Sequence, residues 1–333
     1  MKIIRYILLP VVPIYFVVTW LRNKLYDSGI KPSQHYDFPV ICVGNLSTGG
    51  TGKTPMIEYL IRLLKEDYRI ATLSRGYKRT TEGFILASET DNATTIGDEP
   101  FQFYSKYKDI HVAVDADRRS GISKLRALNP KPEVILLDDA FQHRKVKAGV
   151  NILLTPYSEP FYSDIVLPTG NLREPRMGYK RADIIIVTKC PERLSDEEKK
   201  QIRDKISPST NQPVFFSHIK YGDKVMSNHS EKTLTSLSAF TLVTGIANPA
   251  PLVKHLKDNG LEFDHLVYPD HYNFKPNDLE QLKAKSLIVT TEKDFVRLNS
   301  NKDLSERLFY LPIEFVIDKD EEFNTKIRSL ITN

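Results

Sequence analysis

Cysteine is almost absent from this sequence, since Cys42 and Cys190 are the only two among 333 residues. Both lie in apolar, strand-like runs, so a disulfide framework is excluded and a reducing compartment is indicated. An excess of one charge is also lacking, because 47 basic and 42 acidic residues leave a net charge of only +5. That balance suggests an anionic partner but is too small to indicate nucleic acid. Internal repeats and low-complexity tracts are absent, and nothing indicates a protein partner.

The composition is that of an ordinary globular protein, with 41% hydrophobic, 10% aromatic and 27% charged residues. This balance excludes disordered, collagen-like and coiled-coil chains. The length favours two domains over one.

The N-terminal segment, residues 1–28, is the most biased part of the chain. No residue from Tyr6 to Leu21 is charged, and basic residues bracket the run on both sides. The run is shorter than the about 20 apolar residues that a spanning helix needs, and Pro10 and Pro13 weaken the helix. No small-residue cleavage site follows, which disfavours a signal peptide. The segment predicts a membrane-associated helix beside anionic lipid, with a buried core helix as the alternative.

Beyond this segment, continuous apolar runs alternate with amphipathic helices, which indicates a mainly parallel sheet flanked by helices. The first expected domain covers 29–210, with strands at 38–44, 69–74, 134–139, 150–155 and 182–189 and helices at 54–67 and 195–206. Residues 213–222 are expected to form a linker strand. A smaller α/β domain is expected over 211–333, with strands at 239–245, 261–269, 286–291 and 308–317 and a helix near 251–259.

A glycine-rich loop follows the first strand and opens the first helix, with the sequence GNLSTGGTGKTP over 44–55. A strand, a glycine loop, Lys-Thr and a helix together form the arrangement that cradles nucleotide phosphates. Ser47 stands where the strict pattern has glycine. The loop nevertheless predicts a P-loop NTPase-like fold in which Lys53 reaches the phosphates and Thr54 binds magnesium. The nucleotide-binding residues are predicted to be Gly49, Gly50, Thr51, Gly52, Lys53 and Thr54.

Two acids, Asp138 and Asp139, stand at the carboxyl end of the strand at 134–139. Magnesium beside nucleotide phosphates requires one or two such carboxylates, so these acids are candidate metal ligands, with a solvated turn as the alternative. The segment Thr188-Lys189-Cys190-Pro191 lacks the aspartate of a guanine-reading motif. ATP is therefore the favoured nucleotide.

Several further motifs appear in a fixed order along nearly the whole chain. With the phosphate loop, the sequence resembles the tetraacyldisaccharide 4′-kinase (lipid A 4′-kinase) family on the strength of SRGYKR (74–79), GDEP (97–100), DDAFQHRKV (138–146), LPTGNLREP (167–175), PDHYNF (269–274) and TEKD (291–294). Ser47 is in keeping with that family's loop. The resemblance implies transfer of the ATP γ-phosphate to the 4′-hydroxyl of an acylated glucosamine disaccharide 1-phosphate. It further implies a location at the cytoplasmic face of the inner membrane.

The resemblance also assigns candidate residues. Glu174 is similar to the family's magnesium-side acid, and Asp98 with His271 resembles a proton-accepting dyad formed across the cleft between two α/β domains. Aspartate acting alone as the base is the alternative chemistry. Candidate substrate or phosphate contacts are Arg75, Arg118 and Arg173. The roles of GIANP (245–249) and TEKD stay open. A membrane-tethered ATPase switch acting on a protein partner is the alternative function.

Overall fold

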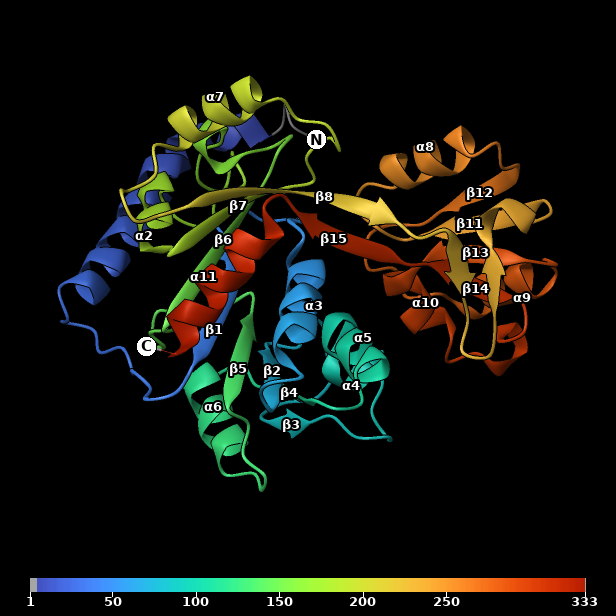
Figure 1. Ribbon diagram of the computed structural model, residues 1–333, viewed down its shortest axis with the longest axis horizontal. Coiled ribbons are helices and arrows are strands. Elements are labelled where there is room, and N and C mark those ends of the chain that lie inside the picture. The colour runs from blue at the N-terminus through green and yellow to red at the C-terminus, as the bar shows by residue number, and fades with distance from the viewer. Residues whose placement is uncertain (1–4, 333) are drawn as a thin grey trace.

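The computed structural model describes residues 5–332. Its larger unit is built on a nine-stranded sheet in the order β15-β8-β7-β6-β1-β5-β2-β4-β3 (Figure 1). The pairs from β8 to β4 are parallel, and only the edge strands β15 and β3 run antiparallel to their neighbours. The strands are β1 (Val40–Asn45), β2 (Ile70–Ser74), β3 (Ile85–Leu86), β4 (His111–Val114), β5 (Val134–Asp138), β6 (Val150–Pro156), β7 (Ile184–Thr188), β8 (Val214–Tyr221) and β15 (Ile313–Ile317).

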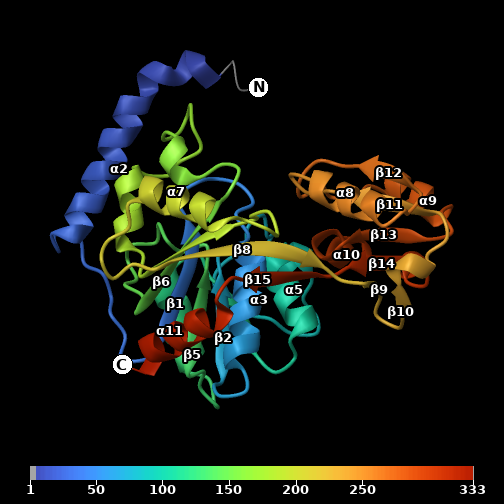
Figure 2. The ribbon, with the colours of Figure 1, turned by 45° about the horizontal axis from the view of Figure 1, so that its top comes forward.

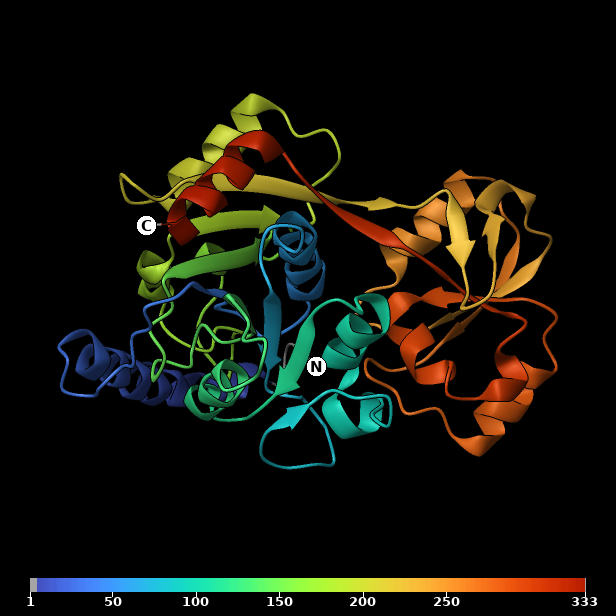
Figure 3. The same ribbon diagram turned by 60° about the horizontal axis from the view of Figure 1, so that its bottom comes forward.

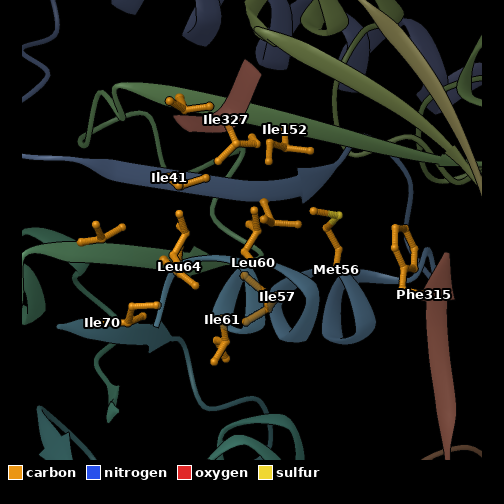
Figure 4. Packing of buried hydrophobic residues seen from close by; sticks show 14 of the residues in the cluster. Ile41, Met56, Ile57, Leu60, Ile61, Leu64, Ile70, Ile152, Phe315 and Ile327 are labelled. Atoms are coloured by element: carbon orange, nitrogen blue, oxygen red, sulfur yellow. The ribbon is translucent and has the colours of Figure 1, made fainter. Parts of the chain in front are cut away.

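Helices cover both faces of this sheet, as its continuous apolar strands require. On one face, residues of three helices pack against the strands: α3 (Lys53–Leu64), α5 (Asp98–Lys106) and α11 (Asp320–Thr332). Figure 4 shows α3 residues, including Met56 and Leu60, facing Ile41 of β1 and Ile152 of β6. On the other face lie α6 (Arg118–Arg126) and α7 (Asp196–Ile206). A short helix, α4 (Ala93–Ile96), precedes α5. The predicted parallel α/β fold is confirmed.

The smaller unit is a six-stranded sheet in the order β10-β9-β14-β13-β11-β12. Its strands are β9 (Lys224–Met226), β10 (Glu231–Thr233), β11 (Phe240–Thr244), β12 (Phe263–Val267), β13 (Ile288–Thr291) and β14 (Leu308–Leu311). Helix α8 (Ala250–Asp258) packs on one face, and α9 (Pro276–Lys283) and α10 (Glu292–Leu298) pack on the other. The strands expected around 239–245, 261–269 and 286–291 all belong to this sheet.

The prediction of one strand over 308–317 is wrong. Pro312 interrupts the apolar run, so β14 joins the smaller sheet and β15 pairs antiparallel with β8 in the larger one. Residues 213–222 are not a simple linker either, because β8 also pairs in parallel with β7. β8 and β15 run side by side between the two units (Figures 1 and 3). The sheets therefore divide the chain differently from the expected boundaries, since residues 313–332 return to the larger unit.

The N-terminal helix has its apolar side turned outward. A 3₁₀ turn over Tyr6–Val11 leads into α2 (Val12–Asp27), which lies along the outside of the larger unit (Figure 2). The stripe facing the protein includes Tyr15, Arg22 and Asn23, which hydrogen-bond to distant segments. The exposed side carries Ile14, Val17, Val18, Trp20 and Leu21. By length and composition the helix over Tyr6–Asp27 is sufficient to cross a membrane. The alternative of a buried core helix is wrong.

Candidate active site

The glycine-rich loop connects β1 to α3 at the carboxyl edge of the large sheet. Gly49 and Gly52 have φ values of 106° and 91°, a left-handed backbone that favours glycine. Ser47 is not among the described residues with positive φ, so serine is tolerated where the strict pattern has glycine. The backbone of Thr48 donates to the Asn171 carbonyl at 2.8 Å, and Arg173 donates to Leu46 at 2.7 Å. The 171–173 segment thus braces one side of the loop.

Lys53 is the first residue of α3, and its ammonium lies 3.7 Å from an oxygen of Asp139. Arg173 holds the same carboxylate with two nitrogens, Nη2 at 2.7 Å and Nη1 at 3.1 Å, and also hydrogen-bonds to Asn45. Burial alone raises the pKa of Asp139, but the Lys53 and Arg173 charges outweigh burial and lower it to about 2. Arg173 is therefore placed beside the loop as a partner of Asp139.

Asp138, the last residue of β5, has the opposite environment. Burial, followed by the nearby charge of Glu99, raises the pKa of Asp138 to about 7. Its Oδ2 lies 3.3 Å from the Ser74 hydroxyl, and its buried Oδ1 has no hydrogen-bond partner. A buried carboxylate oxygen with no donor is suited to a hard cation such as magnesium. The two neighbouring acids are therefore electrostatically distinct.

This difference leads to a stability prediction for the protein without nucleotide. The folded pKa of Asp138 lies above its unfolded value, so ionisation costs stability from about pH 4 upward and the cost levels off above about pH 7. We expect Asp138→Asn to stabilise the fold at pH 8 by on the order of 2 kcal/mol, with the gain vanishing near pH 4. Denaturant unfolding across this pH range measures the difference.

Asp139→Asn is the matched control, because its folded pKa is depressed and its charge is stabilising above about pH 4. We expect that variant to be less stable than the wild type at pH 8. Shifts of the same sign in both variants would contradict the assigned environments.

Glu174 does not join these acids. It is buried, and its oxygens accept hydrogen bonds from Asn23 at 2.6 Å, Arg181 at 2.8 Å and Gln142 at 2.9 Å. Within residues 5–332, no three His, Cys, Asp or Glu side chains gather in a group able to hold a metal ion. The geometry therefore does not favour the predicted magnesium role of Glu174. Through these hydrogen bonds, Glu174 connects the N-terminal helix to the segment of residues 171–181.

The other two arginines predicted as substrate contacts have contrasting positions. Arg118 is buried, and its guanidinium donates to the backbone carbonyls of Asp115 at 3.1 Å and Asp138 at 3.4 Å. These bonds support the end of β5 and leave Arg118 away from any exposed ligand. Arg75 follows β2 and is exposed, so it is accessible to a ligand at the same sheet edge.

Asp98 and His271, which lie 173 positions apart in sequence, meet across the two units. Asp98 begins α5 of the larger unit, His271 lies in the loop after β12, and His271 Nδ1 is 2.8 Å from Asp98 Oδ2. Burial alone would raise the pKa of Asp98, but hydrogen bonds from His271 and Arg297 outweigh burial and hold it below its usual value. Asp98 is therefore a carboxylate at neutral pH.

Two cations of α10 that the sequence reasoning left unassigned complete this cluster. Arg297 Nη2 donates to Asp98 at 2.6 Å, and Lys293 Nζ lies 2.9 Å from His271 Nε2 and 3.1 Å from Glu99. Lys189 is a further missed residue, whose ammonium donates to the Gly50 carbonyl at 2.6 Å. In the sequence, the TEKD motif and the Thr188-Lys189 pair were the features that could have pointed to Lys293 and Lys189. Nothing in their spacing identified the partners, which belong to distant segments.

These parts form one site. The charges of Lys53 and Lys293 both act on Lys189 and lower its pKa, after the larger effect of burial. Lys189, which donates to the phosphate loop, thus feels the charge of Lys293, the neighbour of His271 in the pair that Asp98 of the larger unit forms with His271 of the smaller one. A phosphate loop, acids at the neighbouring strand end and a histidine of a second α/β unit that meets a carboxylate of the first define the class of nucleotide-dependent kinases.

The chain belongs to the Tetraacyldisaccharide-1-P 4′-kinase family, whose sequence model matches residues 4–332. The Tetraacyldisaccharide 4′-kinase of Flavobacterium johnsoniae is 50% identical over 337 residues, covering 99% of this chain and 98% of that protein. The same enzyme of Flavobacterium psychrophilum is 51% identical over 335 residues, covering 98% and 97%.

A solved structure agrees with this assignment. The chain is similar to LpxK from Aquifex aeolicus, determined in complex with ATP, with a TM-score of 0.79 and 30% sequence identity. The match covers 98% of this chain and 99% of that one. The kinase interpretation and the fold are thereby confirmed, and the ATPase-switch alternative is not favoured.

Proposed function

We propose that this kinase transfers the γ-phosphoryl group of ATP to the 4′-hydroxyl of a tetraacyldisaccharide 1-phosphate. The hydroxyl oxygen bonds to the γ-phosphorus, the bond from phosphorus to the oxygen of the departing ADP breaks, and the hydroxyl proton passes to the protein. The observation that carries the proposal is the contact of 2.8 Å between Asp98, in the unit that holds the phosphate loop, and His271 of the second unit. Such transfers depend mainly on positioning and on compensating the phosphate charges.

The phosphates would be held by the backbone of residues 49–52 and by Lys53, which exchanges its contact with Asp139 for the nucleotide. Thr54, at the start of α3, and Asp138, with its unpartnered oxygen, are the residues that fit magnesium, with Asp139 beside them. Magnesium bound there would neutralise charge on the phosphate oxygens. Arg173 fixes Asp139, and exposed Arg75 is available to the acceptor lipid.

His271 is the proposed acceptor of the hydroxyl proton, with Asp98 orienting its ring and supporting the charge that forms. The 2.8 Å contact between Nδ1 and Asp98 leaves Nε2 as the nitrogen available to the hydroxyl. Transfer of the proton to Asp98 directly would require the hydroxyl to displace both His271 and Arg297 from this carboxylate. The histidine route requires the hydroxyl to displace only Lys293, whose ammonium lies 2.9 Å from Nε2.

The acceptor is a lipid, and the proposed location is the cytoplasmic face of the inner membrane. The outward apolar side of α2 and the exposed basic residue Lys24 suit a bilayer surface with anionic headgroups, whereas Arg5 and Arg22 hydrogen-bond to the protein itself. The same helix contacts the site-forming segments, through Asn23 to Glu174 and Tyr15 to the Arg173 carbonyl. The anchor would therefore set the height of the site above the membrane.

The test of this function follows the label from [γ-³²P]ATP in a reaction with the acylated disaccharide 1-phosphate. We expect label in a chloroform-extractable disaccharide carrying two phosphates. Release of label only as inorganic phosphate would instead support the ATPase-switch function. Omitting the disaccharide serves as the control, since a lipid kinase then retains the label in ATP.

The anchor is tested by a matched pair of single substitutions. Val18 on α2 and Val267 on β12 are 60% and 62% exposed, so aspartate at either position disturbs little packing. We expect Val18→Asp to lower the affinity for vesicles of anionic phospholipid by about tenfold. The aspartate charge must then either enter the apolar layer of the bilayer or keep that part of α2 out of it. Val267→Asp should bind as the wild type does. Co-sedimentation measures both, and equal binding by all three proteins would rule out α2 as the membrane contact.

A further inference from the structure

The ring of His271 is fixed on several sides. Its backbone has a φ of 56°, uncommon for a non-glycine residue, and its N–H donates to the Gly245 carbonyl at 3.2 Å. Tyr77, from the loop after β2, packs edge-on against the imidazole with ring centroids 5.6 Å apart. The ring therefore presents its two nitrogens to fixed partners, and the chemistry of those partners decides where its proton resides.

On the Nδ1 side the partner is an ionised carboxylate. Asp98 Oδ2 lies 2.8 Å from Nδ1, and a carboxylate can only accept, so Nδ1 must carry a hydrogen. Arg297 Nη2 also lies 3.2 Å from Nδ1 but is closer to Asp98, at 2.6 Å. Arg297 thus keeps Asp98 charged and oriented.

On the Nε2 side the partner is an ammonium. Lys293 Nζ lies 2.9 Å from Nε2, and an ammonium group can only donate, so Nε2 must offer its lone pair. Both contacts therefore select the same form of the ring, the neutral tautomer with hydrogen on Nδ1. That form is the one in which Nε2 is ready to accept a proton.

Lys293 is itself held in place. It lies in the first turn of α10, and its ammonium pairs with Glu99 of α5 at 3.1 Å. Two more ion pairs tie the same helices together, between Arg297 and Asp98 and between Glu292 and Lys106. The contact of Lys293 with Nε2 is thus a product of how the two units are joined.

We propose that Lys293 is a positioning residue for the base, whose ammonium keeps His271 in the neutral Nδ1–H tautomer, with no hydrogen on Nε2. The groups facing the ring are Asp98 from α5, Lys293 and Arg297 from α10, and uncharged Tyr77, with Glu99 behind Lys293. Of these, only Lys293 opposes a second proton by occupying the nitrogen that would receive it. The link to catalysis rests on the proposed function, but the state of the ring does not.

The consequence is visible in the pH dependence. Removing a cation beside an imidazole favours its doubly protonated form. In Lys293→Met we expect His271 to take up its second proton at a higher pH than in the wild type. The kcat for lipid phosphorylation should then be about tenfold below the wild type at pH 6 and within about twofold of it at pH 9. Lys293→Arg retains the charge and should restore the wild-type profile.

The decisive measurement is ¹H–¹⁵N NMR of the histidine rings in the full-length protein in detergent micelles, with the His271 signals assigned by their loss in His271→Gln. We expect the Nδ1–H pattern in the wild type at neutral pH and earlier protonation in Lys293→Met. Lys106→Met is the control, because it removes another α5–α10 ion pair without touching the ring. Its titration should match the wild type.

Three results separate the possibilities. A wild-type ring with hydrogen on Nε2, or identical titrations in the wild type and Lys293→Met, overturns the role of Lys293 whatever the enzyme phosphorylates. A shift in Lys106→Met equal to that in Lys293→Met reduces Lys293 to a structural tie and also overturns it. Failure of wild-type protein to label the acylated disaccharide overturns the proposed function instead, and leaves the NMR comparison valid.

Discussion

Lys53→Ala is expected to lower kcat for phosphoryl transfer by at least about 100-fold. The ammonium of Lys53 stands at the start of α3, where phosphate charge would be received, and a cation placed there gains strength as charge develops in the transition state. The fold should survive, because Asp139, the partner of Lys53 at 3.7 Å, retains its two contacts with Arg173.

Lys65→Ala provides the control, since Lys65 lies just beyond the other end of the same helix and pairs with Asp109 on the surface. It should retain wild-type kcat. Both variants are compared by label transfer from ATP to lipid, and by thermal unfolding to verify the fold. Near-normal turnover in a folded Lys53→Ala protein would remove the nucleotide site from this loop.

The second large effect is expected at the Asp98–His271 pair. Either single alanine variant should lower kcat by roughly 10²–10⁴-fold, the usual contribution of a positioned base, with little change in KM for ATP. Because the two residues act through one hydrogen bond of 2.8 Å, the double variant should be only slightly slower than the slower single one. Steady-state kinetics of the four proteins give this comparison.

His265→Ala is the matched control for the cycle, since His265 belongs to the same unit but contacts Thr244, at 2.9 Å, and not Asp98. Combined with Asp98→Ala, it should show additive effects. Additive losses for Asp98 and His271 themselves would reject the dyad and favour Asp98 alone as the base. Asp98→Asn is a useful companion, because it retains the size of the side chain beside Arg297.

The elements that could be predicted from the sequence are those with a local cause. The strands β1, β2, β5, β6 and β7 are continuous apolar runs. The glycines of the phosphate loop likewise predict the left-handed backbone found at Gly49 and Gly52. The prediction of a single strand over 308–317 failed, because the sequence of an apolar strand does not show which sheet the strand joins. Only the pairing of Tyr310 with β13 and of Phe315 with β8 reveals that Pro312 separates two strands.

The candidate site was predictable to the same degree. Lys53, Asp138 and Asp139 lie at strand and helix ends that the pattern locates. The hydrogen bonds of Glu174 could not be predicted, because its three donors, Asn23, Gln142 and Arg181, come from separate segments, and its metal role stays a prediction. The cations of α10 were missed for the same reason. Their partners on α5 lie nearly 200 positions earlier, with Arg297 and Asp98 separated by 199 residues.

The pairing of β8 with β15 makes the smaller unit an insertion within the larger one. Tyr221 and Ile313 are partners at the junction, so the chain leaves and re-enters the core at adjacent points. During synthesis on the ribosome, the whole inserted unit is made before β15 and α11, whose Phe323, Ile327 and Ile331 fill the core around α3 and β1. A nascent chain therefore holds an incomplete nucleotide core until residues 313–332 emerge, and a premature stop codon within them would damage the phosphate-binding unit while leaving the inserted unit whole.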